Sequence, residues 1–382
     1  MIPFQIAGRT YVDGLISKRL GETKLGEHVQ TVHEYNWEEE LYNSNARFVL
    51  LGIPEDIGVR ANYGRGGTYT MWEPALRAIL NVQDTKKLQG KDLLVLGAFD
   101  FRELMDETNN ADVNTLRQVV VHIDEAVSVM IQKIVTAGKV PIVVGGGHNN
   151  AYPLLQAVST VKGQKINCIN LDAHSDYRMM EGRHSGNGFH YAKRKGYLHK
   201  YAIVGLHENY NSQYIMDALE ADHDIYYSTY EGIFLREEQT FLQSVRDALK
   251  HTGRTARGIE LDLDCIERVL SSAATPCGLT TLQARQYITQ CAMAGNAAYL
   301  HLPEGAAKIG AVEDFYIAFP QLPYTVLQRQ SFLLPFYHVH DLAVHLQYYV
   351  QYYSSHCQKS YQTVQVFPAQ LFVVIHCRLS LP

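Results

Sequence analysis

Between residues 47 and 302, short apolar runs rich in valine and isoleucine alternate with segments of helical periodicity. This alternation is typical of a parallel sheet covered by helices, because strands buried on both faces read as continuous apolar runs. The expected strands are residues 47–53, 93–99, 140–145, 165–171, 201–206, 224–228, 257–263 and 297–302. The expected helices are about 70–82, 112–137, 149–161, 236–251 and 280–294. The pattern therefore predicts an α/β fold.

The domain organisation follows from the continuity of this pattern. No internal repeat or low-complexity linker interrupts residues 47–305. We therefore predict one domain over residues 47–315, preceded by an N-terminal extension, residues 1–46.

The C-terminal segment, residues 316–382, departs from the rest of the chain in composition. Among its residues only Arg329, Asp341, Lys359 and Arg378 are charged, beside many Tyr, Gln, His and Phe. Three interpretations remain open for it: an added apolar module, an association surface, or the product of a shifted reading frame or wrong gene model.

Six potential metal ligands lie in three short clusters, each where an apolar run meets a loop. The clusters contain His148, then Asp172, His174 and Asp176, then Asp262 and Asp264. Ligand sites of open parallel sheets form at the carboxyl ends of the strands, where all three clusters are expected. Two imidazoles and four carboxylates without a thiolate favour Mn²⁺, Fe²⁺ or a catalytic Zn²⁺ over a structural zinc site.

The cost of burying these carboxylates points to bound cations. A carboxylate at the end of an apolar strand has a desolvation penalty of several kcal/mol, and four converging carboxylates also repel one another. Two divalent cations about 3.5–4 Å apart would offset both effects and activate a shared water. The clusters therefore predict a metal-dependent hydrolase.

The glycines before His148 have two interpretations. Gly145, Gly146 and Gly147 could cradle a phosphate at the start of the following helix, or they could let the backbone turn sharply so that His148 points into the site. The run lacks the GxxxxGK[ST] spacing, so the sequence favours the turn.

Charge and hydropathy limit the classes of partner. The formal charge is −5, from 39 acidic and 34 basic residues, so no basic field favours nucleic acid or an anionic membrane. No apolar stretch of about 18 residues is present, and the start lacks the pattern of a secretory signal. We therefore expect a cytoplasmic protein without nucleic-acid or membrane partners.

Taken in order, the three clusters resemble motifs of the ureohydrolase superfamily, which includes arginases, agmatinases and formiminoglutamases. The chain carries GGGHNN at residues 145–150, DAHSDYR at 172–178 and ELDLD at 260–264. The resemblance covers about residues 47–310. It implies a three-layer α/β/α fold around an eight-stranded, mostly parallel sheet, a centre of two Mn²⁺ ions, a small-molecule substrate and a homo-oligomer.

The resemblance also implies roles for individual residues. One metal would be held by His148, Asp172, Asp176 and Asp262, and the other by Asp172, His174, Asp262 and Asp264, with Asp172 and Asp262 bridging. Glu304 matches the glutamate that receives the substrate's amidine or guanidine nitrogen. Ser185 and Asn187 match residues that bind the amino-acid end, and His190 matches a proton shuttle.

Departures from the arginase pattern point to a formiminoglutamase-like substrate. Gly147 stands where arginases and agmatinases carry an aspartate, and Glu267 and Arg268 replace the usual Asp-Pro. Arg178 and Arg183 could attract a dianionic substrate.

The resulting hypothesis is hydrolysis of N-formimino-L-glutamate to L-glutamate and formamide by metal-bridging hydroxide, with Asp176 or Asp264 passing a proton to the leaving nitrogen. A guanidine substrate, as in arginases, agmatinases or guanidinobutyrases, and a metal-binding protein without turnover remain the alternatives.

Overall fold

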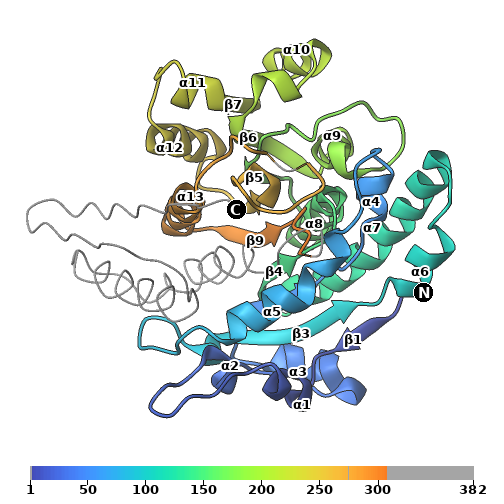
Figure 1. Cartoon of the computed structure of the whole chain (residues 1–382), viewed down its shortest axis with the longest axis vertical. Helices are drawn as coiled ribbons and strands as arrows, with labels where there is room; N and C mark the ends of the chain where they lie inside the picture. Colours follow the sequence, from blue (N-terminus) through green and yellow to red (C-terminus); the bar gives the residue numbers. More distant parts are fainter. Residues whose placement is uncertain (1, 274, 308–382) are drawn as a thin grey trace, which may run out of the picture. The chain divides into compact units, whose positions relative to one another are not determined.

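A computed structural model describes residues 2–273 and 275–307 of the chain (Figure 1). The C-terminal segment, residues 316–382, lies outside the described residues, so its three interpretations stay open. Within the described part, one nine-stranded sheet has the order β1-β3-β2-β4-β9-β8-β5-β6-β7. The strands are β1 (Phe4–Ile6), β2 (Phe48–Gly52), β3 (Leu93–Phe99), β4 (Val140–Val144), β5 (Ile166–Leu171), β6 (Leu198–Leu206), β7 (Ile225–Thr229), β8 (Arg257–Leu261) and β9 (Ala297–Leu302).

Strands β2 to β9 are the eight strands expected from the sequence, and every pairing among them is parallel. The ninth strand, β1, comes from the N-terminal extension and pairs antiparallel with β3. The sequence pattern missed β1 because three residues are too few to show a periodicity. The sheet is therefore mostly parallel, with one antiparallel edge strand.

Helices cover both faces of the sheet and give three layers. The α-helices are α1 (Arg9–Gly14), α2 (Leu25–His28), α3 (Trp37–Asn43), α4 (Ile57–Arg60), α5 (Trp72–Leu80), α6 (Arg102–Glu107), α7 (Val113–Thr136), α8 (Ala151–Lys162), α9 (Gly188–Arg194), α10 (Gln213–Ala221), α11 (Tyr230–Phe234), α12 (Phe241–Thr252) and α13 (Thr281–Ala294). Short 3₁₀ helices are η1 (Glu34–Asn36), η2 (Thr68–Thr70), η3 (Gly90–Asp92), η4 (His148–Asn150), η5 (Ser185–Asn187), η6 (Glu208–Tyr210) and η7 (Leu263–Cys265).

Two apolar cores lie on the two faces. One contains side chains of α5, α12 and α13, and the other contains side chains of α7, α8 and α9; Figure 1 shows these two helix groups on opposite sides of the sheet. The three-layer α/β/α prediction is confirmed.

Local capping explains where the helices begin. The expected helix 112–137 corresponds to α7. This helix begins after Asp112, because the Asp112 side chain accepts hydrogen bonds from the backbone N–H groups of Asn114 and Thr115. The expected helix 236–251 begins only at Phe241, because the Thr240 hydroxyl caps that turn by accepting from the Gln243 N–H. Before it, Glu237 has a φ of 52°, which interrupts a regular helix.

Strand order brings distant loops together. Strands β4, β9, β8 and β5 are consecutive neighbours at the centre of the sheet, although they are far apart in the chain. Because all four run parallel, their carboxyl ends lie at the same edge. The three ligand clusters and Glu304 follow these four strands directly.

At the opposite end of β8, Arg257 is 1% exposed and lies against the C-terminal ends of two helices. Its Nε donates to Thr252 Oγ1 at 3.0 Å, and its guanidinium also contacts the carbonyl oxygens of Gly253 and Gly295, just after α12 and α13. A cation there complements both helix dipoles.

Replacing Arg257 with methionine should lower the free energy of unfolding by about 2–4 kcal/mol, because buried acceptors would lose their donor. Urea unfolding measures this change. Arg246→Met, at an exposed position of α12, is the matched control and should change stability by less than about 0.5 kcal/mol. Equal effects of the two substitutions would contradict the role of Arg257.

Candidate metal centre

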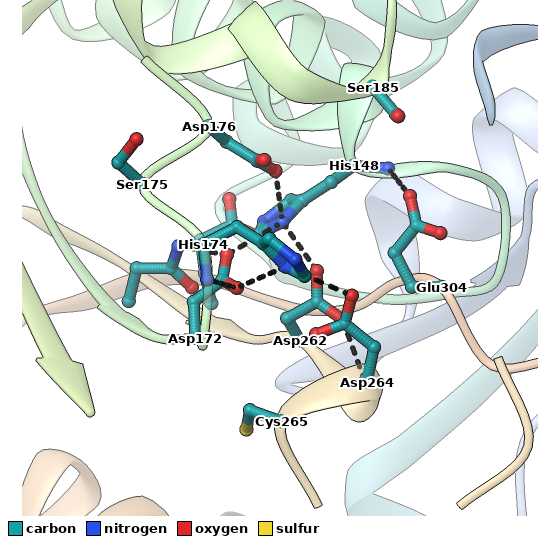
Figure 2. Close-up of polar contacts among 12 residues, drawn as sticks. His148, Asp172, His174, Ser175, Asp176, Ser185, Asp262, Asp264, Cys265 and Glu304 are labelled. Carbon is teal, nitrogen blue, oxygen red and sulfur yellow. Dashed lines mark hydrogen bonds and ion pairs between the residues drawn. The ribbon is translucent and has the colours of Figure 1, made fainter. Parts of the chain in front are cut away.

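The six predicted ligands converge at the carboxyl ends of β4, β5 and β8; we call them the six-residue cluster (Figure 2). His148 Nδ1 lies 2.8 Å from Asp176 Oδ2, 2.9 Å from Asp262 Oδ2 and 3.3 Å from Asp172 Oδ2. The ligand atoms of these four residues lie within 4.8 Å of one another. They have the spacing needed to hold one cation.

A second group adjoins the first. His174 Nδ1 lies 3.3 Å from Asp264 Oδ2 and 3.6 Å from Asp172 Oδ1. Asp172 thus belongs to both groups, as expected for a bridging ligand. Asp262 belongs only to the first group in this arrangement, so the expected sharing of Asp262 is not reproduced. Asp262 Oδ1 instead accepts a hydrogen bond from the Asp264 N–H at 2.9 Å.

Electrostatics of the six-residue cluster favours bound cations. Burial, followed by repulsion from Asp172, raises the pKa of Asp176 to about 6. Burial and the charges of Asp264 and Asp172 also raise the pKa of Asp262 well above its usual value. Both ring nitrogens of His148 and Oδ1 of Asp264 are buried without a hydrogen-bond partner. Carboxylates in this environment fit divalent cations, which remove the repulsion and satisfy the orphaned atoms.

The loop before His148 uses its glycines for a turn. Gly145 and Gly146 have φ values of 86° and 75°, and a Cβ on Gly146 would lie 2.9 Å from the carbonyl oxygen of Ile53. The next N–H, of Gly147, donates to the Glu55 carboxylate at 3.0 Å. This loop therefore aims His148 by a sharp turn, and the phosphate interpretation has no support, because a buried carboxylate already takes the Gly147 N–H.

Glu304 lies beside the six-residue cluster, at the end of β9 (Figure 2). Its Oε1 accepts from the His148 N–H at 2.8 Å, and its Oε2 accepts from Ser272 Oγ at 2.7 Å. Burial, followed by the charge of Asp264, raises the pKa of Glu304 to about 8. The backbone of Glu304 is left-handed, with a φ of 65°, which is costly for a non-glycine residue and is concentrated at functional sites.

Asn187 and Arg183 do not face a substrate. Arg183 is 4% exposed, and its Nε donates to Asp124 at 2.9 Å while its Nη1 donates to Asn187 Oδ1 at 2.6 Å. Asn187 Nδ2 donates to the carbonyl oxygens of Met179 and Gly182. The side chains of both residues are thus engaged inside the protein. The interpretation of Arg183 as an attractor of substrate is wrong, and the side chain of Asn187 orders its own loop.

The other three expected substrate or shuttle residues make no hydrogen bond or ion pair with the six-residue cluster. Ser185 Oγ accepts from Asn62 Nδ2 at 3.3 Å, and no ion pair or hydrogen bond joins it to the cluster in Figure 2. Arg178 is exposed, with its side chain against Gly186. His190 stacks on Tyr177 with ring centroids 4.4 Å apart, and its Nδ1 donates to the Arg178 carbonyl at 2.8 Å.

A family model described as the arginase family matches residues 46–305. The chain belongs to the arginase family. The matched region contains the six-residue cluster, Glu304 and strands β2 to β9.

Similar proteins agree with this placement in the arginase family. A formimidoylglutamase of Macrococcus caseolyticus is 27% identical over 262 residues, which cover 67% of this chain and 76% of that protein. The structure of a formimidoylglutamase from Bacillus subtilis has a TM-score of 0.66 at 18% identity, over 84% of this chain and 95% of that one. The manganese-containing formiminoglutamase of Trypanosoma cruzi has a TM-score of 0.64 at 16% identity, over 80% and 98%.

Its family makes this chain a hydrolase that acts on C–N bonds of amidines. The Macrococcus caseolyticus relative, which has the highest sequence identity of the three proteins named above, is a formimidoylglutamase, whereas the two structural likenesses show the fold alone. Among the described residues, no helix is long and apolar enough to cross a membrane.

Two residues that support the arginase-family site, Glu55 and Tyr210, were not predicted from the sequence. Glu55 is fully buried and accepts from the N–H groups of Gly58 and Gly147 and from the side chain of Asn150. Tyr210 stacks on His174, with ring centroids 5.4 Å apart. A usable signal existed only for Glu55, which follows a predicted strand as closely as the ligands do; nothing in the sequence places Tyr210 over His174.

His184 adds a pH dependence to the stability of this arginase-family chain. It is fully buried, and its Nδ1 accepts from the Gly186 N–H at 3.2 Å, which requires a neutral ring. Burial, followed by the charges of Arg117, Arg178 and Arg183, lowers its pKa from 6.5 to about 3. As the pH falls below 6.5, His184 binds a proton in the unfolded chain but not in the folded chain. The free energy of unfolding therefore decreases between pH 6.5 and about 3.

Within that window, the neutral His184 should lower the free energy of unfolding by about 1.4 kcal/mol for each unit by which the pH falls. His184→Asn retains an acceptor for the Gly186 N–H but cannot titrate, so urea unfolding at pH 7 and pH 5 should show a smaller loss for the variant. Exposed His223→Asn is the control and should keep the wild-type loss. A wild-type loss in both variants would argue against a neutral, buried His184.

Proposed function

We propose that the chain hydrolyses N-formimino-L-glutamate to L-glutamate and formamide. The observation that carries the proposal is the convergence of four carboxylates on the Nδ1 atoms of His148 and His174, with Glu304 next to them. The formimidoylglutamase relatives, one of them containing manganese, support this substrate and this metal.

Two Mn²⁺ ions are the proposed cofactors. His148, Asp172, Asp176 and Asp262 would hold one, and Asp172, His174 and Asp264 would hold the other. Two divalent cations held there would supply a hydroxide nucleophile near neutral pH and electrostatic stabilisation of the charge that develops.

The chain's own residues would bind the two ends of the substrate. The Glu304 carboxylate would pair with the cationic formimino group, as charge-assisted hydrogen bonds require. At the other end, the exposed side chain of Arg178 makes no hydrogen bond or ion pair with other described residues, so its guanidinium is available for a substrate carboxylate. Ser185 precedes Gly186, which lies against the Arg178 side chain. The Ser185 hydroxyl, which accepts from Asn62, would add a polar group at this end of the substrate.

Hydrolysis distributes the atoms of one water molecule between the two products. The oxygen joins the formimino carbon to give formamide, and the bond from this carbon to the glutamate nitrogen breaks. The departing nitrogen needs a proton, for which Asp264 is a suitable carrier because its Oδ1 is buried and unpaired; Asp176 is the second choice. His190 would act only in proton exchange with solvent, because its Nδ1 donates to the Arg178 carbonyl and its ring makes no ion pair with the six-residue cluster.

The decisive experiment supplies the purified full chain with Mn²⁺ and measures metal content, formamide and urea. The substrates are N-formimino-L-glutamate, arginine, agmatine and guanidinobutyrate. Two manganese ions with formamide release from the first substrate are expected. Urea release from a guanidine would overturn the substrate while keeping the chemistry. Two metals without turnover of any substrate would instead favour a binding protein.

A further inference from the structure

A buried carboxylate lies behind His148, on the side of its ring that faces away from the six-residue cluster. Glu260 Oε2 lies 3.4 Å from His148 Nε2, whereas Nδ1 of the same ring faces Asp176, Asp262 and Asp172. Both Glu260 and His148 are 0% exposed. Neither the resemblance nor the proposed reaction gives Glu260 a role, so its burial needs a separate explanation.

Neighbours on strand β9 fix the Glu260 carboxylate. Glu260 on β8 is directly opposite His301 on β9, and His301 Nδ1 lies 2.7 Å from Glu260 Oε2. From the same strand, the Tyr299 hydroxyl donates to Glu260 Oε1 at 2.6 Å. His301 and Tyr299 are also fully buried. Each carboxylate oxygen therefore has a defined partner, and Oε2 is held between two imidazoles.

Burial of Glu260 would be unfavourable without these partners. A carboxylate without donors costs several kcal/mol to desolvate, and this one is met by a hydroxyl and two imidazole rings. The arrangement is thus a built feature of the two central strands. It leaves Glu260 Oε2 facing Nε2 of His148 at 3.4 Å, an ion-pair distance, and this buried nitrogen makes no hydrogen bond with the described residues.

A histidine that ligates a cation through one ring nitrogen must carry its proton on the other. A carboxylate at the protonated nitrogen sets this tautomer, fixes the orientation of the ring and makes the ligating nitrogen more basic. At His148, the nitrogen that faces the carboxylates of the six-residue cluster is Nδ1, and the nitrogen that faces Glu260 is Nε2.

We infer that Glu260 is a positioning residue, which holds the Nε2 proton of His148 so that Nδ1 is presented to the cation of the first group, and that His301 and Tyr299 hold Glu260 in place. This inference rests on the proposed function in one respect, which is that the six-residue cluster binds metal. One specific consequence follows. Glu260 should strengthen binding of the metal held by His148 and leave the affinity for the metal held by His174 unchanged.

Mn²⁺ titration of the full chain tests this consequence, with free Mn²⁺ followed by electron paramagnetic resonance. His148→Ala and His174→Ala assign the two binding steps to the two groups. Glu260→Gln should weaken the His148 step about tenfold to a hundredfold and change the His174 step by less than about threefold. Tyr287→Phe is the matched control, because Tyr287 is buried and its hydroxyl bonds to the main chain of Glu260 but not to its carboxylate. It should leave both steps unchanged.

A conservative variant keeps the test open if Glu260→Gln does not fold. Glu260→Asp retains the charge on a shorter side chain, so its His148 step should be weakened by less than in Glu260→Gln, and by at least about threefold against wild type. Unchanged His148 affinity in the variant that folds would overturn the inference, as would equal weakening of both steps. A third manganese ion lost with Glu260 would also overturn it, because the residue would then be a ligand. Wild-type protein that binds no Mn²⁺ would overturn the inference and the proposed function together, whereas two ions with no effect of Glu260 would overturn the inference alone.

Discussion

Replacing Asp172 with alanine should abolish binding of both manganese ions and reduce amidine hydrolysis at least about a thousandfold, or about 4 kcal/mol in transition-state stabilisation. Asp172 is the one residue shared by both ligand groups, with Oδ2 facing His148 and Oδ1 facing His174. Metal content of the purified variant and its kcat/KM measure the two effects.

Two further substitutions sharpen this prediction. Asp262→Ala should remove mainly the His148 metal, because Asp262 belongs only to the first group. Asp217→Ala, at an exposed position of α10, should retain both metals and full activity. Turnover within tenfold of wild type in Asp172→Ala would rule out the proposed use of the six-residue cluster. Loss of both metals in Asp262→Ala would instead indicate that Asp262 is a ligand of both metals.

Glu304→Gln should lower kcat/KM for N-formimino-L-glutamate about a hundredfold to a thousandfold while both metals remain bound. The amide keeps the shape of Glu304 and can accept from the His148 N–H, while its NH₂ group faces the Ser272 hydroxyl, which can accept. Only the carboxylate that would pair with the cationic substrate is lost; the charges of the substrate and of the two cations would keep Glu304 ionised despite its raised pKa. Steady-state kinetics, combined with metal analysis, separate this loss from a loss of metal.

Ser272→Ala is the matched control for Glu304→Gln. It removes one hydrogen bond to Oε2 of Glu304 and leaves the carboxylate charged, so we expect kcat/KM to fall less than about tenfold. Activity near wild type in Glu304→Gln would show that Glu304 serves only the backbone of His148. A loss of metal in Glu304→Gln would show that it acts through the six-residue cluster.

Local pattern was sufficient to predict most of the sheet. The expected strand 93–99 is observed with the same bounds, and 140–145 and 297–302 differ from β4 and β9 by at most one residue. The expected strand 257–263 ends earlier, at Leu261, because the Asp262 side chain accepts from the Asp264 N–H and starts η7. Strand ends are decided by such capping bonds, which apolar periodicity does not record.

Residues of the substrate loop could not be assigned in the same way. Arg183 was interpreted as an attractor of substrate because it is a cation near the ligands in the sequence. In the structure its partner is Asp124, which is 59 residues away, and its guanidinium lies between the rings of Tyr152 and Tyr191. A sequence shows that a charge is present, but the partner that neutralises it is set by packing.

The sequence by itself determined the layers of the fold and the six-residue cluster, because strand periodicity and ligand spacing are local properties of the chain. Only the tertiary structure decided that β9 inserts beside β8, which brings Glu304 to the cluster and sets His301 opposite Glu260. It also decided that Asp172 is shared by both groups and that Arg183 is withdrawn from the site. These features depend on contacts between residues far apart in the chain, and such contacts form only when the strands take their order in the sheet.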